Sequence, residues 1–196
     1  NKSIIIMLCL GAVIVSLFIF MTEAARTRML LKRQETQDSL VQAPAFQAEA
    51  LTVTIERQVA FGPRVPNTEV HRACGEYLAR QLKAFGAKVY DQYADVISYD
   101  GKNLKARNIV GSYNPDTKKR VLLCAHWDSR PYADADKEEH LANAEDGAND
   151  GASGVGVLLE IARHLQQQAP AIGIDIVFFD AEDYGILSFY EGDYKQ

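Results

Sequence analysis

Two short apolar runs dominate the hydrophobic pattern in the second half of the chain. Residues 121–125 read VLLCA and residues 174–179 read IDIVFF. Continuous runs of this length are typical of central strands in a parallel sheet. The apolar positions between the two runs recur at helical spacing and predict one amphipathic helix: Val155, Leu158, Leu159, Ala162 and Leu165. The order strand, helix, strand predicts a βαβ unit with a right-handed crossover.

The first half of the chain predicts one helix and two strands. A helix capped by Asn67 and ended by Gly86 fits the apolar positions Val70, Cys74, Tyr77, Leu78, Leu82 and Phe85. Residues 88–96 and 106–113 alternate or cluster apolar side chains, as strands do, and the turn signal Asp100-Gly101 separates them. We therefore expect an α/β fold in which a mixed, largely parallel central sheet is flanked by helices.

The N-terminal segment differs in character from everything that follows it. Residues 4–21 carry no charged side chain and follow Lys2. Because their length falls between that of a signal peptide and that of a membrane span, either a cleaved export signal or a retained anchor is expected. Basic residues after the segment leave its orientation open. We divide the chain into a signal or anchor (1–25), a linker (26–45) and the N-terminal part of one folded domain (46–196), exported to the periplasm or anchored in the inner membrane.

Charge and cysteine content narrow the kinds of molecule that the protein could bind and the disulfides that it could form. A formal charge of −5 and a pI near 5.4 give no reason to expect nucleic acid, which binds clustered Lys and Arg. Apart from Cys9, only Cys74 and Cys124 could pair, so there is no disulfide framework. A bridge is allowed in an oxidising compartment, but two buried free thiols are favoured because both residues lie in apolar patterns.

Acidic residues gather where the two predicted inner strands end. His126 and Asp128 follow the first strand, and the group before the helix and after the second strand is Asp146, Asp150, Asp180, Glu182 and Asp183. The carboxyl ends of these strands meet at one sheet edge, where open α/β folds bind ligands. Several carboxylates at one edge repel one another, and a bound cation relieves that repulsion. With a histidine available, zinc fits this donor set better than calcium or magnesium.

Each of these residues also has a purely structural interpretation. Asp150 could cap the following helix, Asp180 could cap a strand end, and Glu182 with Asp183 could lie in a solvated loop. The loop interpretation is the less favoured one, because a buried strand that ends in acids is costly unless they have partners. His126 alone is weak evidence for a metal. No role is assigned to His71, His140 and His164, which fall on presumed helix surfaces or in a polar loop.

Three ordered motifs give a specific resemblance. VLLCAHWDS, EDGANDGASGVGVLLEIARHL and IDIVFFDAEDYG resemble the zinc-dependent aminopeptidase and glutaminyl cyclase superfamily, in which a His-x-Asp, a metal-binding Asp before a helix and an acidic pair occur in this order. FGPRVPNT (61–68), RNIV (107–110) and HWDSRPYAD (126–134) resemble the glutaminyl cyclases, particularly bacterial ones related to the animal enzymes. The resemblance runs from about residue 45 to the end.

The resemblance implies roles for individual residues. Asp150 and Asp183 would bind zinc, and Glu182 would transfer the proton. His126, with Asp128, would be a hydrogen-bonding neighbour in a cyclase with one zinc, whereas His126 would hold a second zinc in an aminopeptidase. The family supplies one more histidine ligand from a later loop. No histidine follows His164, so we expect the printed chain to be truncated within its catalytic domain.

The expected function is a monomeric glutaminyl-peptide cyclotransferase that converts N-terminal glutamine on peptides and proteins to pyroglutamate. A zinc aminopeptidase is the alternative, and an inactive or binding-only fragment is the third hypothesis. Trp127 and Tyr132 could line the pocket or serve packing alone. Uncleaved residues 4–21 would add the membrane as a partner.

Overall fold

The computed structural model describes residues 21–32, 44–133 and 143–185, and the chain divides into two compact units, Asn1–Pro44 and Ala45–Gln196. In the first unit, residues 21–32 are helical. All of the apolar segment 4–21 except Met21 lies outside the described residues. Within the described part, none of the helices is both long and apolar enough to cross a bilayer. Export and anchoring therefore stay predictions.

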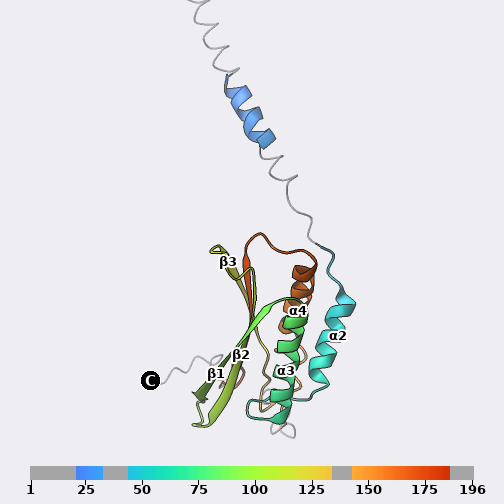
Figure 1. The fold of residues 1–196 in the computed structure, drawn as a ribbon, viewed down its shortest axis with the longest axis vertical. Helices are drawn as coiled ribbons and strands as arrows, with labels where there is room; N and C mark the ends of the chain where they lie inside the picture. The colour runs from blue at the N-terminus through green and yellow to red at the C-terminus, as the bar shows by residue number, and fades with distance from the viewer. Residues whose placement is uncertain (1–20, 33–43, 134–142, 186–196) are drawn as a thin grey trace, which may run out of the picture. The chain divides into compact units, whose positions relative to one another are not determined.

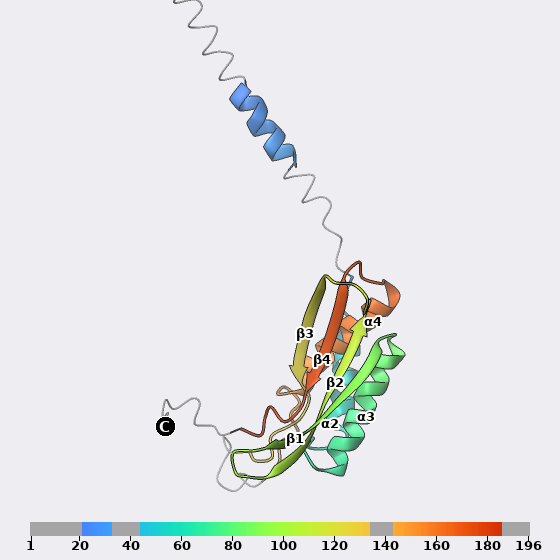
Figure 2. The ribbon, with the colours of Figure 1, turned by 60° about the vertical axis from the view of Figure 1, so that its left-hand side comes forward.

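The second unit, drawn in Figure 1, contains a four-stranded sheet in the order β1-β2-β4-β3, which Figure 2 shows with all four strands labelled. Its strands are β1 (Lys88–Ile97), β2 (Asn103–Tyr113), β3 (Arg120–His126) and β4 (Gly173–Phe179). β3 and β4 pair in parallel and are joined through a helix, which confirms the βαβ unit. The other two pairs, β1 with β2 and β2 with β4, are antiparallel.

The expectation of a largely parallel sheet is wrong for the described residues. A five-residue connection joins β1 to β2, and a connection this short can only return the chain antiparallel to itself. The turn is closed by the N–H of Ser98, which donates to the carbonyl of Lys102, and by the N–H of Gly101, which donates to Ser98. The mixed α/β class itself is confirmed.

Three helices lie on the same side of this sheet: α2 (Ala48–Val59), α3 (Glu69–Ala84) and α4 (Ala152–Gln167) (Figures 1 and 2). α3 packs on β1 and β2, α4 packs on β3, and α2 packs on α4. The core between helices and sheet is formed by side chains at helical spacing on α3 and α4 and at alternate positions of β4: Cys74, Leu78, Leu82, Val155, Leu159, Ile176 and Phe178. Cutting a buried leucine or isoleucine of this kind to alanine costs about 2–5 kcal/mol.

The start of α3 differs from the expected cap. Thr68, not Asn67, is the N-cap, and its hydroxyl accepts the N–H of His71 at 3.1 Å. Asn67 has a φ of 72°, which is left-handed and incompatible with the extended backbone of an N-cap. Its side chain instead bonds to the neighbouring strand, accepting the N–H of Lys105 at 2.8 Å and donating to the carbonyl of Asn103 at 2.9 Å.

Both described cysteines are free, as favoured, but only Cys74 is buried. Burial raises the pKa of the Cys74 thiol to about 12. The expectation of a buried Cys124 is wrong. Leu123 and Ala125 pack toward the core, so alternation along β3 turns Cys124 to the face away from the helices.

Candidate active site

Three loops meet at the carboxyl edge of β3 and β4, as the sequence predicted. His126 and Phe179 are register partners, and the N–H of Trp127 donates to the carbonyl of Phe179 at 3.0 Å. The segments that leave these strands, residues 127–133 and 180–185, therefore start side by side. The loop of residues 143–151 enters α4 at the same edge, because the ring of His126 reaches Asp150.

Asp128 holds the backbone of the acidic pair Glu182 and Asp183 in place. Its side chain is fully buried, and its two oxygens accept the backbone N–H groups of Glu182 at 3.3 Å and Asp183 at 3.1 Å. A carboxylate that accepts two backbone N–H groups fixes the course of the chain that donates them. Asp128 therefore holds the loop that carries the acids.

His126 lies among three carboxylates. Its Nε2 is 2.9 Å from Oδ1 of Asp150, and its Nδ1 lies 3.4 Å from Oδ1 of Asp128 and 3.9 Å from Oε2 of Glu182. The carboxylate of Asp128, followed by those of Glu182 and Asp150, raises the pKa of His126 to about 9 in spite of burial. The geometry toward Asp128 does not make a hydrogen bond, so Nδ1 is a buried nitrogen without a hydrogen-bond partner among the described residues.

Glu182 and Asp183 are adjacent in sequence but have opposite environments. The Glu182 side chain is 64% exposed, whereas Asp183 is buried. Desolvation raises the pKa of Asp183 to about 6, and the nearby charges of Asp150 and Asp128 add to that effect. Arg130 opposes the shift through an ion pair of 3.1 Å with Oδ1 of Asp183. One acid of the pair is thus free in solvent and the other is desolvated.

Asp150 does not cap α4. The N-cap is Gly151, which makes no side-chain cap hydrogen bond, and the Asp150 side chain is 63% exposed. Gly151 has a φ of 86°, and a Cβ there would lie 2.7 Å from the carbonyl oxygen of Asp128. This close approach requires glycine. A cavity of about 490 Å³ opens beside Asp150 and is lined by Ala133 and residues 143–150.

These residues fit zinc only in part. The donor set is chemically suitable, since Asp150 and Asp183 supply carboxylate oxygens close enough for their charges to interact, and Nε2 of His126, 2.9 Å from Asp150, is a nitrogen of the kind that binds zinc. Within the described ranges, however, no group of three or more His, Cys, Asp or Glu side chains is arranged to hold a metal ion. The described residues therefore place two of the expected zinc ligands, Asp150 and Asp183, within range of each other's charge, but they do not by themselves form a zinc site.

Three residues hold the site together in ways that sequence reasoning missed, although Asp180 was already among the acids expected at this edge. Arg64 is fully buried and clamps two of the loops: its guanidinium donates to the carbonyls of Trp127 at 3.0 Å, Asp146 at 2.7 Å and Gly147 at 2.8 Å. The only signal for Arg64 is its place in the motif FGPRVPNT. The other two are His71 and Asp180, which form a buried pair 2.8 Å apart. The expectation that His71 lies on a helix surface is therefore wrong.

The two candidate pocket aromatics have different surroundings. Trp127 is fully buried, stacks on His71 with 4.3 Å between ring centroids, and donates its Nε1–H to the carbonyl of Arg107 at 3.2 Å. Of the two uses left open for Trp127, packing in the core on the α3 side is the one that its contacts show, and its ring also lines the cavity between α3 and the β1–β2 hairpin. The Tyr132 hydroxyl accepts from Lys102 at 3.2 Å, as the Tyr184 hydroxyl does at 3.1 Å. Lys102 thus ties the β1–β2 turn to two of the site loops.

His140 lies outside the described residues. His164, to which no role was assigned, is on α4 and lies 3.2 Å from Glu160, away from the sheet edge that carries the acids.

One protein-family model and several solved structures are similar to this chain. The model of peptidase family M28 matches residues 108–188. A crystal structure of Bacteroides thetaiotaomicron glutaminyl cyclase bound to N-acetylhistamine is 61% identical, with a TM-score of 0.74, over 79% of this chain and 53% of that one. A crystal structure described as a leucine aminopeptidase precursor from the same species is 60% identical, with a TM-score of 0.75, over 80% of this chain and 54% of that one.

A curated relative is similar to this chain at lower sequence identity. The uncharacterized protein YfbL of Escherichia coli (strain K12) is 30% identical over 67% of this chain and 38% of its own length. The chain thus spans about half the length of the two solved structures and about two fifths of this relative.

Proposed function

Since this chain belongs to peptidase family M28, we propose that the full-length protein is a zinc-dependent glutaminyl-peptide cyclotransferase, which converts an N-terminal glutamine to pyroglutamate and releases ammonia. The observation that carries this proposal is the split environment of the adjacent acids. Glu182 is exposed and stands beside His126, while Asp183 is desolvated. Two titratable groups in opposite environments are the usual arrangement for a proton-transferring acid next to a charge-binding one.

Asp150 and Asp183 would hold the metal, with a third ligand from outside the described residues. When bound, zinc supplies Lewis-acid polarisation of the side-chain carbonyl of the substrate glutamine. Asp183 suits this position because a desolvated carboxylate gains most from a nearby cation. Asp128 keeps both members of the acidic pair in place through their backbone N–H groups.

Glu182 would carry the proton. Its carboxylate accepts a proton from the α-amine of the substrate as the amine nitrogen bonds to the side-chain carbonyl carbon of glutamine. The carbon–nitrogen bond of the side-chain amide then breaks, and Glu182 returns the proton to the departing nitrogen, which leaves as ammonia. The products are a five-membered lactam and ammonia, so atoms and charge balance. Ring closure is intramolecular, so the enzyme has mainly to orient the substrate and exclude water.

A zinc aminopeptidase is the second candidate, and the position of His126 favours it. Its Nε2 lies 2.9 Å from Oδ1 of Asp150, so a second metal bound by this carboxylate would lie within reach of the imidazole. One of the solved structures similar to this chain is also described as a leucine aminopeptidase precursor. In that case Glu182 would activate a water molecule against the first peptide bond.

The two candidates differ in the products that they release. We expect the full-length, zinc-loaded protein to release ammonia from a Gln-initiated dipeptide without cleaving it. A leucine-initiated dipeptide of the same length is the matched substrate for peptidase activity. Cleavage of both dipeptides without cyclisation would reject the cyclotransferase and support the aminopeptidase.

The proposed setting of the reaction is outside the cytoplasm, with peptide or protein N-termini as substrates. This part of the proposal depends on the uncharged residues 4–21. Recovery of the protein in the cytoplasmic fraction of its own cells would contradict it.

A further inference from the structure

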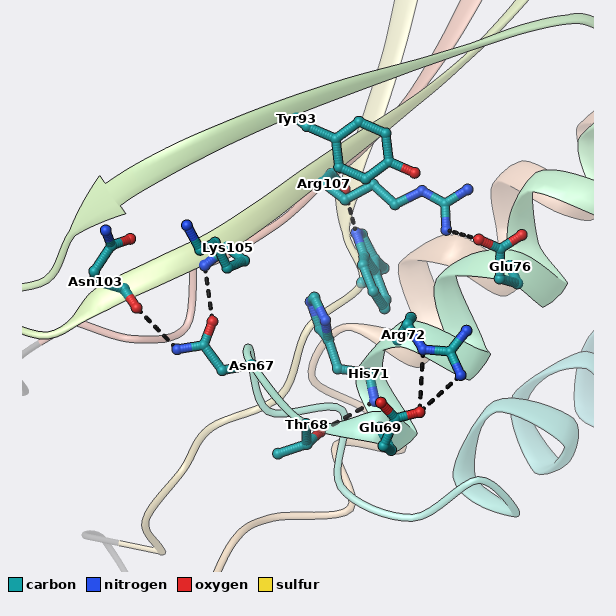
Figure 3. A pocket seen from close by; sticks show the side chains of 11 residues that line it. Asn67, Thr68, Glu69, His71, Arg72, Glu76, Tyr93, Asn103, Lys105 and Arg107 are labelled. Atoms are coloured by element: carbon teal, nitrogen blue, oxygen red, sulfur yellow. Dashed lines mark hydrogen bonds and ion pairs between the residues drawn. The ribbon is translucent and has the colours of Figure 1, made fainter.

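His71 occupies a place that the proposed reaction does not yet explain. It lies in the first turn of α3, its backbone N–H bonds to the Thr68 hydroxyl, and it is only 5% exposed (Figure 3). The ring borders a cavity of about 560 Å³ between α3 and the β1–β2 hairpin. Its Nε2 is within hydrogen-bond distance of both carboxylate oxygens of Asp180, at 2.8 and 2.9 Å. A buried histidine with so complete a set of contacts has a fixed orientation.

Asp180 is the first residue of the loop that carries the acidic pair, and its side chain is 0% exposed. Besides the imidazole of His71, it accepts the backbone N–H of Arg107 at 2.6 Å and that of Ala181 at 2.8 Å. Its own N–H donates to Oδ1 of Asn108 at 2.9 Å. Asp180 is therefore an anchor that ties this loop to β2 and α3, and both of its carboxylate oxygens accept hydrogen bonds.

The residue after this anchor has a strained backbone. Ala181 has a φ of 60°, a left-handed conformation that costs a non-glycine residue about 1–2 kcal/mol. Such a turn persists only where the contacts on either side hold it. Those contacts are Asp180 before the turn and the buried carboxylate of Asp128 after it, which accepts the N–H groups of Glu182 and Asp183. The direction of the Glu182 side chain is set between these two carboxylates.

His71 also contacts the other loop of the site. Its ring stacks on Trp127, with an interplanar angle of 20°. Trp127 stands between His126 and Asp128 in sequence, and it packs so tightly on α3 that a Cβ added to Gly75 would lie 3.0 Å from its Cη2. One imidazole therefore contacts the segments that leave both β3 and β4.

We propose that His71 is a positioning residue that sets the orientation of Glu182 by holding Asp180 with its Nε2–H while its ring stacks on Trp127. His71 does not reach the reacting atoms itself. It acts by keeping the strained turn at Ala181 from relaxing, and relaxation there would move the proton-carrying carboxylate away from its place. This inference rests on the proposed role of Glu182, and it holds whether the reaction is cyclisation or peptide cleavage.

Two substitutions separate the hydrogen bond from the packing. H71F keeps an aromatic ring for stacking on Trp127 but removes the donor to Asp180. H71Q loses the ring but places an amide N–H near the position of Nε2. We expect kcat of the full-length protein to fall about 10- to 100-fold in H71F, the usual range for residues that orient catalytic groups. We expect KM and bound zinc to change little, and H71Q to recover most of the lost kcat.

His164, near the C-terminal end of α4, provides a matched control. His164 is a partly buried histidine that also pairs with an acid, but its partner Glu160 lies on the same helix, α4, and not in a loop of the site. H164F should lower the midpoint of thermal unfolding without lowering kcat. If H71F does not fold, D180N provides the same test, because it keeps the shape of the anchor and removes one acceptor. We expect D180N to lower kcat by a similar factor.

The inference is overturned if any folded variant among H71F and D180N keeps the wild-type kcat, or if H71Q loses as much kcat as H71F. Each variant is assayed against the wild type on the dipeptide that the wild type turns over. A wild type that cleaves peptides and does not cyclise them therefore contradicts the proposed function, yet it still gives a result on His71.

Discussion

Two sets of polar residues meet at the same sheet edge, and they differ in almost every physical property. Arg64, His71, Asp128 and Asp180 are buried, and each has fixed partners. Asp150 and Glu182 have side chains more than 60% exposed. Leaving a buried polar group unpaired costs about 1–3 kcal/mol, so the first set must be fully bonded for the domain to fold. The exposed acids stay in contact with water and do not need such partners, so they are available to a ligand.

The difference shows that stability and chemistry are assigned to neighbouring residues. Asp180 and Glu182 are two positions apart in one loop, and Asp128 lies two positions after His126, the last residue of β3. In each pair, one side chain fixes the backbone and the other faces the proposed reaction. Substitutions in the two sets should therefore have separable effects on kcat and on the free energy of unfolding.

The largest expected effect is on activity alone. E182Q removes the proposed proton carrier and keeps its size, so kcat of the full-length protein should fall about 10²- to 10⁴-fold. The midpoint of thermal unfolding should stay at the wild-type value because the side chain is exposed. Ammonia release and differential scanning calorimetry measure the two quantities. Normal turnover in E182Q would show that this exposed acid is not needed for the reaction.

The next effect is mainly on stability. R64M leaves three carbonyl oxygens, that of Trp127 buried and those of Asp146 and Gly147 partly buried, without their guanidinium donor, and we expect the free energy of unfolding to fall by about 3–5 kcal/mol. Urea unfolding followed by circular dichroism measures the loss. R80M, which changes an exposed arginine of α3, is the control and should leave stability unchanged. Equal stability of R64M and R80M would contradict the clamp.

Glu160, a buried acid outside the site, extends the comparison to the pH dependence of stability. Glu160 pairs with Arg163 at 2.7 Å and accepts the N–H of Gln47 at 3.1 Å, and the hydrogen bond with Arg163 is the main reason that its pKa is lowered to about 2. A depressed carboxylate pKa contributes stability above the ordinary pKa of 4.5, and that stability is lost as the pH falls toward 2. E160Q should therefore be less stable than the wild type by about 1–3 kcal/mol at pH 7.

The test for Glu160 is the slope of stability with pH. The free energy of unfolding of the wild type should fall more steeply than that of E160Q between pH 4.5 and pH 2. Parallel curves for the two proteins over this interval would show that Glu160 contributes no pH-dependent stability.

The smallest effect is expected one turn from His71 on the same helix. Glu69 forms an ion pair of 2.7 Å with Arg72, but its side chain is 83% exposed. Solvent and salt screen such a pair. E69Q should change neither the midpoint of thermal unfolding nor kcat within error. A clear loss of either would show that burial does not decide which polar residues of α3 matter.

Much of the fold and part of the site could be predicted from local patterns in the sequence. Apolar runs predicted β3 and β4, helical spacing predicted α3 and α4, and the βαβ order placed His126, Asp150 and Glu182 at one edge. The antiparallel half of the sheet was missed because apolar runs do not record which strand pairs with which. The distinction between anchoring and exposed acids was also missed. Asp180 gains its role from His71, which lies 109 positions earlier, and only the folded chain brings the two together.

The central claim is that the carboxylates at this edge bind zinc beside Glu182. The most direct test is to measure zinc content and turnover of the full-length protein before and after dialysis against a strong chelator, and again after zinc is restored. The account predicts bound zinc in the native protein, loss of turnover with loss of the metal, and recovery on reconstitution. Full turnover in protein shown to be free of zinc and other transition metals would contradict it.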